Sequence, residues 1–135
     1  MSKADADAEM EVYRGIQGEI GKLAGARQQL ISQVNENGMV KQELDLLEDS
    51  ATVFKLVGPI LVKQELGEAK VNVEKRLEFI KNELEKVQNN ITEKEEEQVK
   101  SREKIIEIQK SMQASAAEAA QAAGEKAIAD QAASS

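Results

Sequence analysis

Two long segments of the sequence place apolar residues at alternating spacings of three and four, the repeat that brings one face of a helix into a coiled coil. In residues 9–47, seven of ten repeat positions are apolar, and the exceptions are Arg27, Asn37 and Lys41. In residues 68–112, nine of twelve are apolar. The first set of positions is Tyr13, Ile16, Ile20, Leu23, Arg27, Leu30, Val34, Asn37, Lys41 and Leu44. The second set is Val73, Leu77, Ile80, Leu84, Val87, Ile91, Lys94, Gln98, Ser101, Ile105, Ile108 and Met112.

The two repeats have nearly equal lengths of about 40 to 45 residues, which corresponds to helices of roughly 60–70 Å. Helices of equal length joined by a short connector fold back on each other and pair their apolar seams. Only 2% of the residues are aromatic and 32% are charged, a composition that suits thin helical architecture better than a wide core. The sequence therefore predicts a mainly α fold, a long antiparallel two-helix coiled coil.

The connector, residues 52–64, has the composition of a β-hairpin. Its sequence TVFKLVGPILVKQ is apolar and β-branched on both sides of Gly58-Pro59. Gly accepts the positive φ that the first central position of a type II′ turn requires, and Pro accepts the negative φ of the second. A two-residue loop then places Val57 opposite Ile60 and continues outward in register.

Both faces of this hairpin are apolar, and two helix ends are too narrow to cover both. At roughly 1.5–3 kcal/mol per buried side chain, leaving half of its eight apolar residues in water would forgo about 6–12 kcal/mol. We therefore expect the hairpin to assemble with hairpins of other subunits into a closed β-barrel platform. The eight apolar residues are Val53, Phe54, Leu56, Val57, Ile60, Leu61, Val62 and Leu66, and Gly58 and Pro59 form the turn of this assembly element.

The ends of the chain are expected to be less ordered. Residues 1–8 are predicted to be a flexible N-terminus, residues 9–113 the coiled coil with its hairpin, and residues 114–135 an Ala-rich mobile tail with partial helicity. The acidic segment 1–11 lacks a basic start and an apolar core, so we expect no signal peptide.

Composition excludes several functions. The net charge of −7 argues against nucleic acid or an anionic membrane as a partner. The chain has no Cys and no His, and no glycine-rich phosphate loop follows a strand, so we expect no catalytic residues, no metal site and no cofactor, and therefore no enzyme. We read the charged run of residues 93–104 as a solvated helix face. The absence of export signals predicts a cytoplasmic protein.

Residues 52–80, TVFKLVGPILVKQELGEAKVNVEKRLEFI, resemble the centre of a β-class prefoldin subunit of the eukaryotic subunit-6 type. The layout of helix, hairpin and helix extends the resemblance over residues 9–112. It implies a heterohexamer of two α-class and four β-class subunits whose hairpins form a double β-barrel. It also implies an ATP-independent chaperone that captures unfolded proteins such as actin and tubulin at the coiled-coil tips and delivers them to a cytosolic group II chaperonin.

If clients bind at the tips, the relevant residues lie where the coiled coil begins and ends. These residues either close the seam or bind clients when the seam frays, and the pattern leaves both roles open. Gly15, Gly18, Gly21 and Gly25 weaken the first helix by about 3–4 kcal/mol in total relative to Ala. They either keep the tip adaptable or permit close helix packing. The client-binding candidates are Met10, Val12, Tyr13, Ile16, Ile105, Ile108 and Met112.

The competing hypothesis is a passive coiled-coil scaffold or tether. A tether has no need for a hairpin with two apolar faces, and it would not suppress aggregation of a denatured client. The hairpin therefore favours the chaperone.

Overall fold

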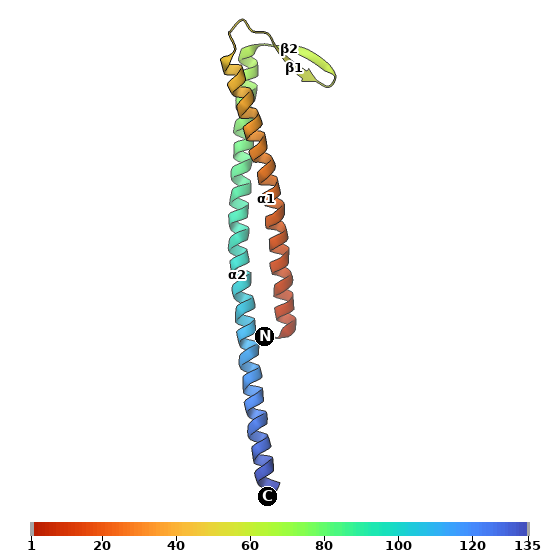
Figure 1. Ribbon diagram of the computed structural model, residues 1–135, viewed down its shortest axis with the longest axis vertical. Coiled ribbons are helices and arrows are strands. Elements are labelled where there is room, and N and C mark those ends of the chain that lie inside the picture. Colours follow the sequence, from red (N-terminus) through yellow and green to blue (C-terminus); the bar gives the residue numbers. More distant parts are fainter. Residues whose placement is uncertain (1, 135) are drawn as a thin grey trace. The chain divides into compact units, whose positions relative to one another are not determined.

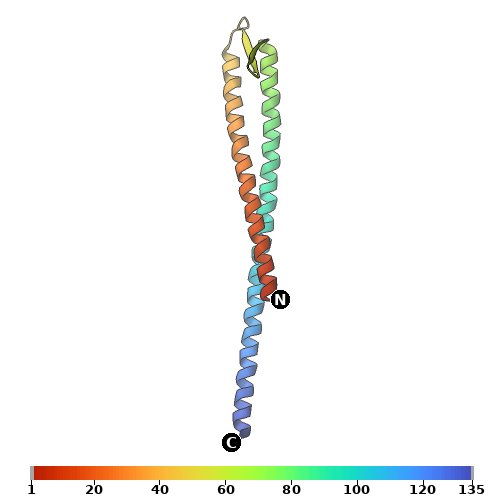
Figure 2. The same ribbon diagram turned by 90° about the vertical axis from the view of Figure 1, so that its right-hand side faces the viewer.

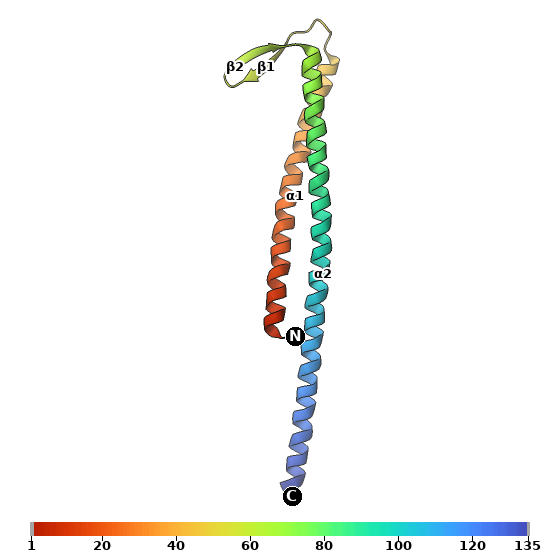
Figure 3. The ribbon, with the colours of Figure 1, turned by 180° about the vertical axis from the view of Figure 1, so that it is seen from behind.

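The computed structural model describes residues 2–134 and has two helices that are connected by a β-hairpin (Figure 1). The elements are α1 (Lys3–Leu46), β1 (Val53–Val57), β2 (Ile60–Gln64) and α2 (Leu66–Ser134). They fall into two compact units: unit 1 contains α1 up to Ile20 and α2 from Glu93, and unit 2 spans Gly21–Thr92. In each unit the two helices lie side by side in opposite directions (Figures 2 and 3). The predicted fold class is confirmed.

Helix α1 begins earlier than the sequence pattern predicts, at Lys3 instead of near Glu9. The cause is a capping box, in which a side chain before the helix and one in its first turn satisfy each other's backbone N–H groups. The backbone N–H of Ser2 donates to Asp5 Oδ2 (2.7 Å), and the N–H of Asp5 donates to Ser2 Oγ (3.3 Å). The segment expected to be a flexible N-terminus is thus helical from Lys3, and its mobility stays a prediction.

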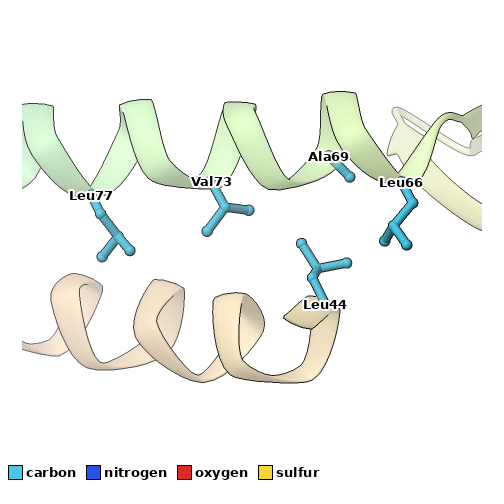
Figure 4. Close-up of a cluster of buried hydrophobic side chains, with 5 residues drawn as sticks. All are labelled: Leu44, Leu66, Ala69, Val73 and Leu77. Carbon is cyan, nitrogen blue, oxygen red and sulfur yellow. The ribbon is translucent and has the colours of Figure 1, made fainter. Parts of the chain in front are cut away.

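The seam follows the predicted repeat closely. All twelve repeat positions of α2 are buried or half-buried, and so are all of those in α1 except Arg27. Unit 2 contains an apolar cluster beside the hairpin, where α2 side chains point toward Leu44 of α1 (Figure 4). Val34 and Val53 pack against this cluster. Its buried members are Leu44, Leu66, Ala69, Val73 and Leu77.

The three polar positions of the α1 repeat bridge to α2 instead of packing apolar surface. Arg27 Nη1 donates to Gln88 Oε1 (2.9 Å), and Lys41 Nζ lies 3.9 Å from Glu74 Oε1. Arg76 Nη1 reaches Asn37 Oδ1 at 3.5 Å. Exposed contacts of this kind contribute at most about 1 kcal/mol each, so they select the register more than they add stability.

The hairpin register is confirmed pair by pair. Val57 pairs with Ile60, Leu56 with Leu61, and the pairing continues outward to Val53 and Gln64. Gly58 has a φ of 58°. Because Pro59 is restricted to negative φ, the positive φ at the first central position corresponds to the predicted type II′ turn.

One member of the predicted apolar ribbon belongs to the helices instead. Leu66 starts α2 and is buried in the cluster with Leu44, so the sequence-based set of eight exposed apolar side chains was too large. Val53 is half-buried against the same cluster. The strand end nearest the helices is therefore anchored by the chain itself.

The Ala-rich segment expected to be a tail is part of α2, which continues to Ser134. Ala has the highest helix propensity and the segment contains no Pro, so nothing in it ends the helix; Gly124 only weakens it. All its described side chains are exposed. Its mobility remains untested. Over residues 2–134, neither helix has an apolar stretch of the length needed to cross a membrane.

Candidate functional site

The hairpin presents large apolar side chains on both of its faces. Six of them remain between 47% and 68% exposed in the isolated chain. Val57, Ile60 and Val62 share one face with the half-buried Val53, and the other face carries three residues of similar size. The six exposed residues are Phe54, Leu56, Val57, Ile60, Leu61 and Val62.

This exposure has an energetic consequence. Fully burying an apolar side chain of this size contributes roughly 1.5–3 kcal/mol, so covering the ribbon would release a free energy comparable to the stability of a whole domain. Both long edges of the two-stranded sheet also offer unpaired backbone groups. The hairpin thus has the chemistry of an assembly element, as the sequence predicts, and the pairing with other subunits remains a proposal.

The second candidate site is the seam of unit 1, where the structure sorts the seven predicted client-binding residues into two groups. Ile16 and Ile108 are buried, each 8% exposed. Tyr13, Ile105 and Met112 are half-buried, so these five residues form or border the seam. The remaining two, Met10 and Val12, lie on the surface of α1.

Polar contacts link the helices within unit 1. Ser101 is only 3% exposed, and its hydroxyl donates to Glu9 Oε1 at 2.7 Å. Lys94 Nζ contacts Glu19 Oε2 at 2.8 Å and Glu97 Oε2 at 3.2 Å. The hydrogen bond to Glu19, followed by that to Glu97, raises the pKa of Lys94 above its usual value. The charged run read as a solvated face therefore also supplies contacts between helices.

Comparison with known proteins identifies the family. A sequence profile described as "Prefoldin subunit" matches residues 7–115. The chain belongs to the prefoldin subunit family. It is 41% identical to prefoldin subunit 6 of Homo sapiens over 116 residues, covering 86% of this chain and 90% of that protein. It is 46% identical to prefoldin subunit 6 of Arabidopsis thaliana over 98 residues, covering 73% and 76%.

A solved structure gives the same fold at low identity. The crystal structure of the prefoldin beta subunit from Thermococcus strain KS-1 superposes with a TM-score of 0.72 at 19% identity, covering 75% of this chain and 89% of that one. The chain shares the fold of that β subunit and is a homologue of prefoldin subunit 6. As a member of this family it is a non-enzymatic chaperone subunit, as the sequence predicts.

The described part of this prefoldin subunit offers no obvious metal site. Within residues 2–134, no group of three or more His, Cys, Asp or Glu side chains is placed to hold an ion.

Sequence reasoning missed two apolar residues in unit 1 of this prefoldin subunit. Val99 and Ile106 are 43% and 45% exposed and lie outside the seam. Their spacing of seven residues places both on one stripe of α2. This spacing is the signal in the sequence from which they could have been found. Together with Met10, Val12 and, in the Ala-rich segment, Ile128, they give the described part of unit 1 five exposed large apolar side chains when its seam is closed.

The glycines of α1 do not serve close helix packing. A Cβ added at Gly15, Gly18, Gly21 or Gly25 would meet no heavy atom within 4 Å, apart from the neighbouring backbone of its own helix. The alternative of a small-residue packing stripe therefore finds no support within the described chain. The hypothesis that these glycines keep the first helix of this prefoldin subunit adaptable remains a prediction.

Proposed function

We propose that this chain is one of four β-class subunits which, with two α-class subunits, form an ATP-independent cytosolic chaperone. In this proposal the complex captures unfolded proteins such as actin and tubulin and delivers them to a group II chaperonin. The observation that carries the proposal is the hairpin with both faces exposed, in a chain that belongs to the prefoldin family.

The hairpin's geometry supports assembly with other subunits. Each subunit brings two strands with two unpaired edges, and strands from neighbours would satisfy those edges while covering the six exposed apolar side chains. A closed barrel removes every edge, which an open pair of hairpins does not. Other prefoldin subunits are thus the fitting occupants of this surface.

Client capture is assigned to unit 1. Its exposed side chains Met10, Val12, Val99 and Ile106 offer apolar contact without an enclosed pocket, which suits partners of varied sequence. Opening of the seam would add Ile16 and Ile108. Several subunits each contributing one weak surface would hold a client by multivalency.

The proposal is tested by reconstituting this chain with the other prefoldin subunits. Native mass spectrometry of the unaltered mixture is expected to give a hexamer, and that complex is expected to suppress aggregation of guanidinium-denatured actin at near-stoichiometric amounts. Leu56→Lys with Leu61→Lys places two charges on one face of the hairpin and is expected to abolish the hexamer.

Phe79→Lys is the matched control, because Phe79 is exposed to a similar extent but lies on α2 away from the strands. It is expected to leave the hexamer and its activity intact. A hexamer that lets denatured actin aggregate freely would instead support a passive scaffold.

A further inference from the structure

The seam of unit 1 is closed by polar contacts at positions where the repeat favours apolar residues. Ser101 occupies a buried repeat position, and its hydroxyl donates to the Glu9 carboxylate at 2.7 Å and lies 3.5 Å from the backbone oxygen of Glu9. A buried hydroxyl without a partner costs roughly 1–3 kcal/mol. The Glu9 carboxylate therefore satisfies the Ser101 hydroxyl while α1 covers it and excludes water.

A second polar contact lies ten residues further along α1. Lys94 Nζ contacts Glu19 Oε2 at 2.8 Å, and Glu97 on its own helix holds the same ammonium group at 3.2 Å. The two contacts bracket residues 9–19 of α1, which contain Tyr13 and Ile16. The same short segment contains Gly15 and Gly18, which contribute no side chain to the contact between the helices. A Cβ added at either would meet no heavy atom within 4 Å outside the neighbouring backbone of its own helix.

The closed state is held weakly by these contacts. A partly exposed ion pair contributes at most about 1 kcal/mol, and a hydrogen bond to a charged group about 1.5–3 kcal/mol. Each glycine lowers the stability of the helix by about 0.8–1 kcal/mol relative to Ala. In the described part of unit 1, the buried apolar side chains are Ile16 and Ile108, each 8% exposed.

We propose that the Glu9–Ser101 and Glu19–Lys94 contacts form a clasp that keeps the client-binding seam of unit 1 shut, and that its opening exposes Ile16 and Ile108 to an unfolded polypeptide. The clasp is an autoinhibitory contact, because the residues that it buries are the apolar ones that a client would cover. The inference rests on the proposed chaperone function and adds the element that regulates it.

A reversible disulfide tests the clasp directly. The chain has no native cysteine, so Glu9→Cys with Ser101→Cys introduces one pair that locks the two helices together when oxidised. A photoreactive benzoylphenylalanine at Tyr13 reports client contact in this subunit alone. In the reconstituted hexamer, oxidation is expected to lower crosslinking to denatured actin roughly fivefold or more relative to the reduced sample.

The control carries Ser101→Cys alone and is expected to crosslink equally under both conditions. Equal crosslinking by the locked and reduced forms of the pair, including none in either, would overturn the clasp. The chaperone proposal is judged separately, by whether the unmodified hexamer suppresses actin aggregation.

Hydrogen exchange of the hexamer without client gives a second, independent test. Ser101→Ala with Glu19→Gln removes both contacts, and the amides of residues 13–20 are expected to exchange roughly tenfold faster. Glu11→Gln is the matched control, since Glu11 pairs with Arg14 on the same helix and joins nothing across the seam. If the amides of residues 13–20 exchange at the same rate in the double variant and in the control, the clasp does not determine how often the seam of unit 1 opens.

Discussion

At the scale of single residues, Gly58 is the position where the backbone most restricts the side chain. Its φ of 58° is rarely adopted by other residues. Gly58→Ala is expected to destabilise the hairpin by about 1–2 kcal/mol and to lower the fraction of hexamer seen by native mass spectrometry. Because a Cβ at Gly58 would meet nothing within 4 Å, the whole effect is assigned to backbone strain.

Gly67→Ala provides the control for this substitution. Gly67 lies in the first turn of α2, has no positive φ and has equally open surroundings. It is expected to assemble at least as well as the unaltered chain. A loss of assembly equal to that of Gly58→Ala would contradict the assignment of the effect to the turn.

The capping box at the start of α1 predicts a pH dependence. The hydrogen bond from the Ser2 backbone, followed by that from the Ser2 hydroxyl, lowers the pKa of Asp5 below its usual value. A carboxyl group whose folded pKa is lowered stabilises the helix fully above its unfolded pKa, and this contribution disappears as pH falls through the folded value. The first turn is therefore expected to fray progressively as pH falls below the usual pKa of an aspartate, and fully once Asp5 is protonated in the folded helix.

Amide exchange of Ala6, followed by NMR, measures this fraying. Asp5→Asn is expected to exchange faster than the unaltered chain at neutral pH and equally fast once Asp5 is protonated. A difference that persists unchanged at low pH would exclude the carboxylate as its cause.

Which residues enter the seam could be predicted from the sequence, whereas their partners could not. Periodicity assigns a face of a helix, so Ser101 and Lys94 were placed correctly at repeat positions. The identity of Glu9 and Glu19 as their partners depends on the relative shift of two helices, which the spacing within one helix does not contain. The capping box was readable from Ser2 and Asp5, but the apolar repeat alone sets the helix start too late.

At the scale of elements, the hairpin was the most predictable part because its two-residue loop fixes every cross-strand pair. The placement of Leu66 was not predictable in the same way. It follows β2 directly and continues its apolar character, but it opens α2 and is buried against Leu44. Tertiary packing, which local alternation does not encode, decided its role.

Helix α1 offers a direct test of the adaptable-tip hypothesis. Replacing Gly15, Gly18, Gly21 and Gly25 by Ala is expected to stabilise α1 by about 3–4 kcal/mol in total, because none of the four new methyl groups meets a neighbour. Thermal unfolding of the hexamer measures the gain, and hydrogen exchange of residues 13–26 locates it.

Client capture by this four-alanine variant is expected to fall, since a stiffer helix opens less often. Gly124→Ala adds the same methyl group to an exposed part of α2 and serves as the control. If the amides of residues 13–26 in the unaltered hexamer are already as protected as those of residues 77–84, the adaptable-tip hypothesis fails.

At the scale of the whole molecule, the two units differ in what holds them together. Polar residues occupy repeat positions in both units, Arg27, Asn37 and Lys41 in unit 2 and Lys94, Gln98 and Ser101 in unit 1, but unit 2 also contains the buried apolar cluster and the hairpin. Apolar burial is insensitive to salt, but exposed ion pairs are screened by it. Raising the salt concentration is therefore expected to speed hydrogen exchange more in residues 13–20 than in residues 73–80, where the apolar cluster contributes more than the Lys41–Glu74 ion pair.

The Ala-rich end of α2 provides the last prediction. All side chains of residues 113–134 are exposed, and the prefoldin profile ends at residue 115. Removing residues 116–135 is expected to preserve the hexamer, whose mass falls only by the mass of the deleted segment. Hydrogen exchange of residues 13–20 is expected to stay the same, because the seam residues up to Met112 are retained. Slower capture of denatured actin by the shortened hexamer would show that the exposed helix contributes to client binding, and loss of the hexamer would assign it to assembly.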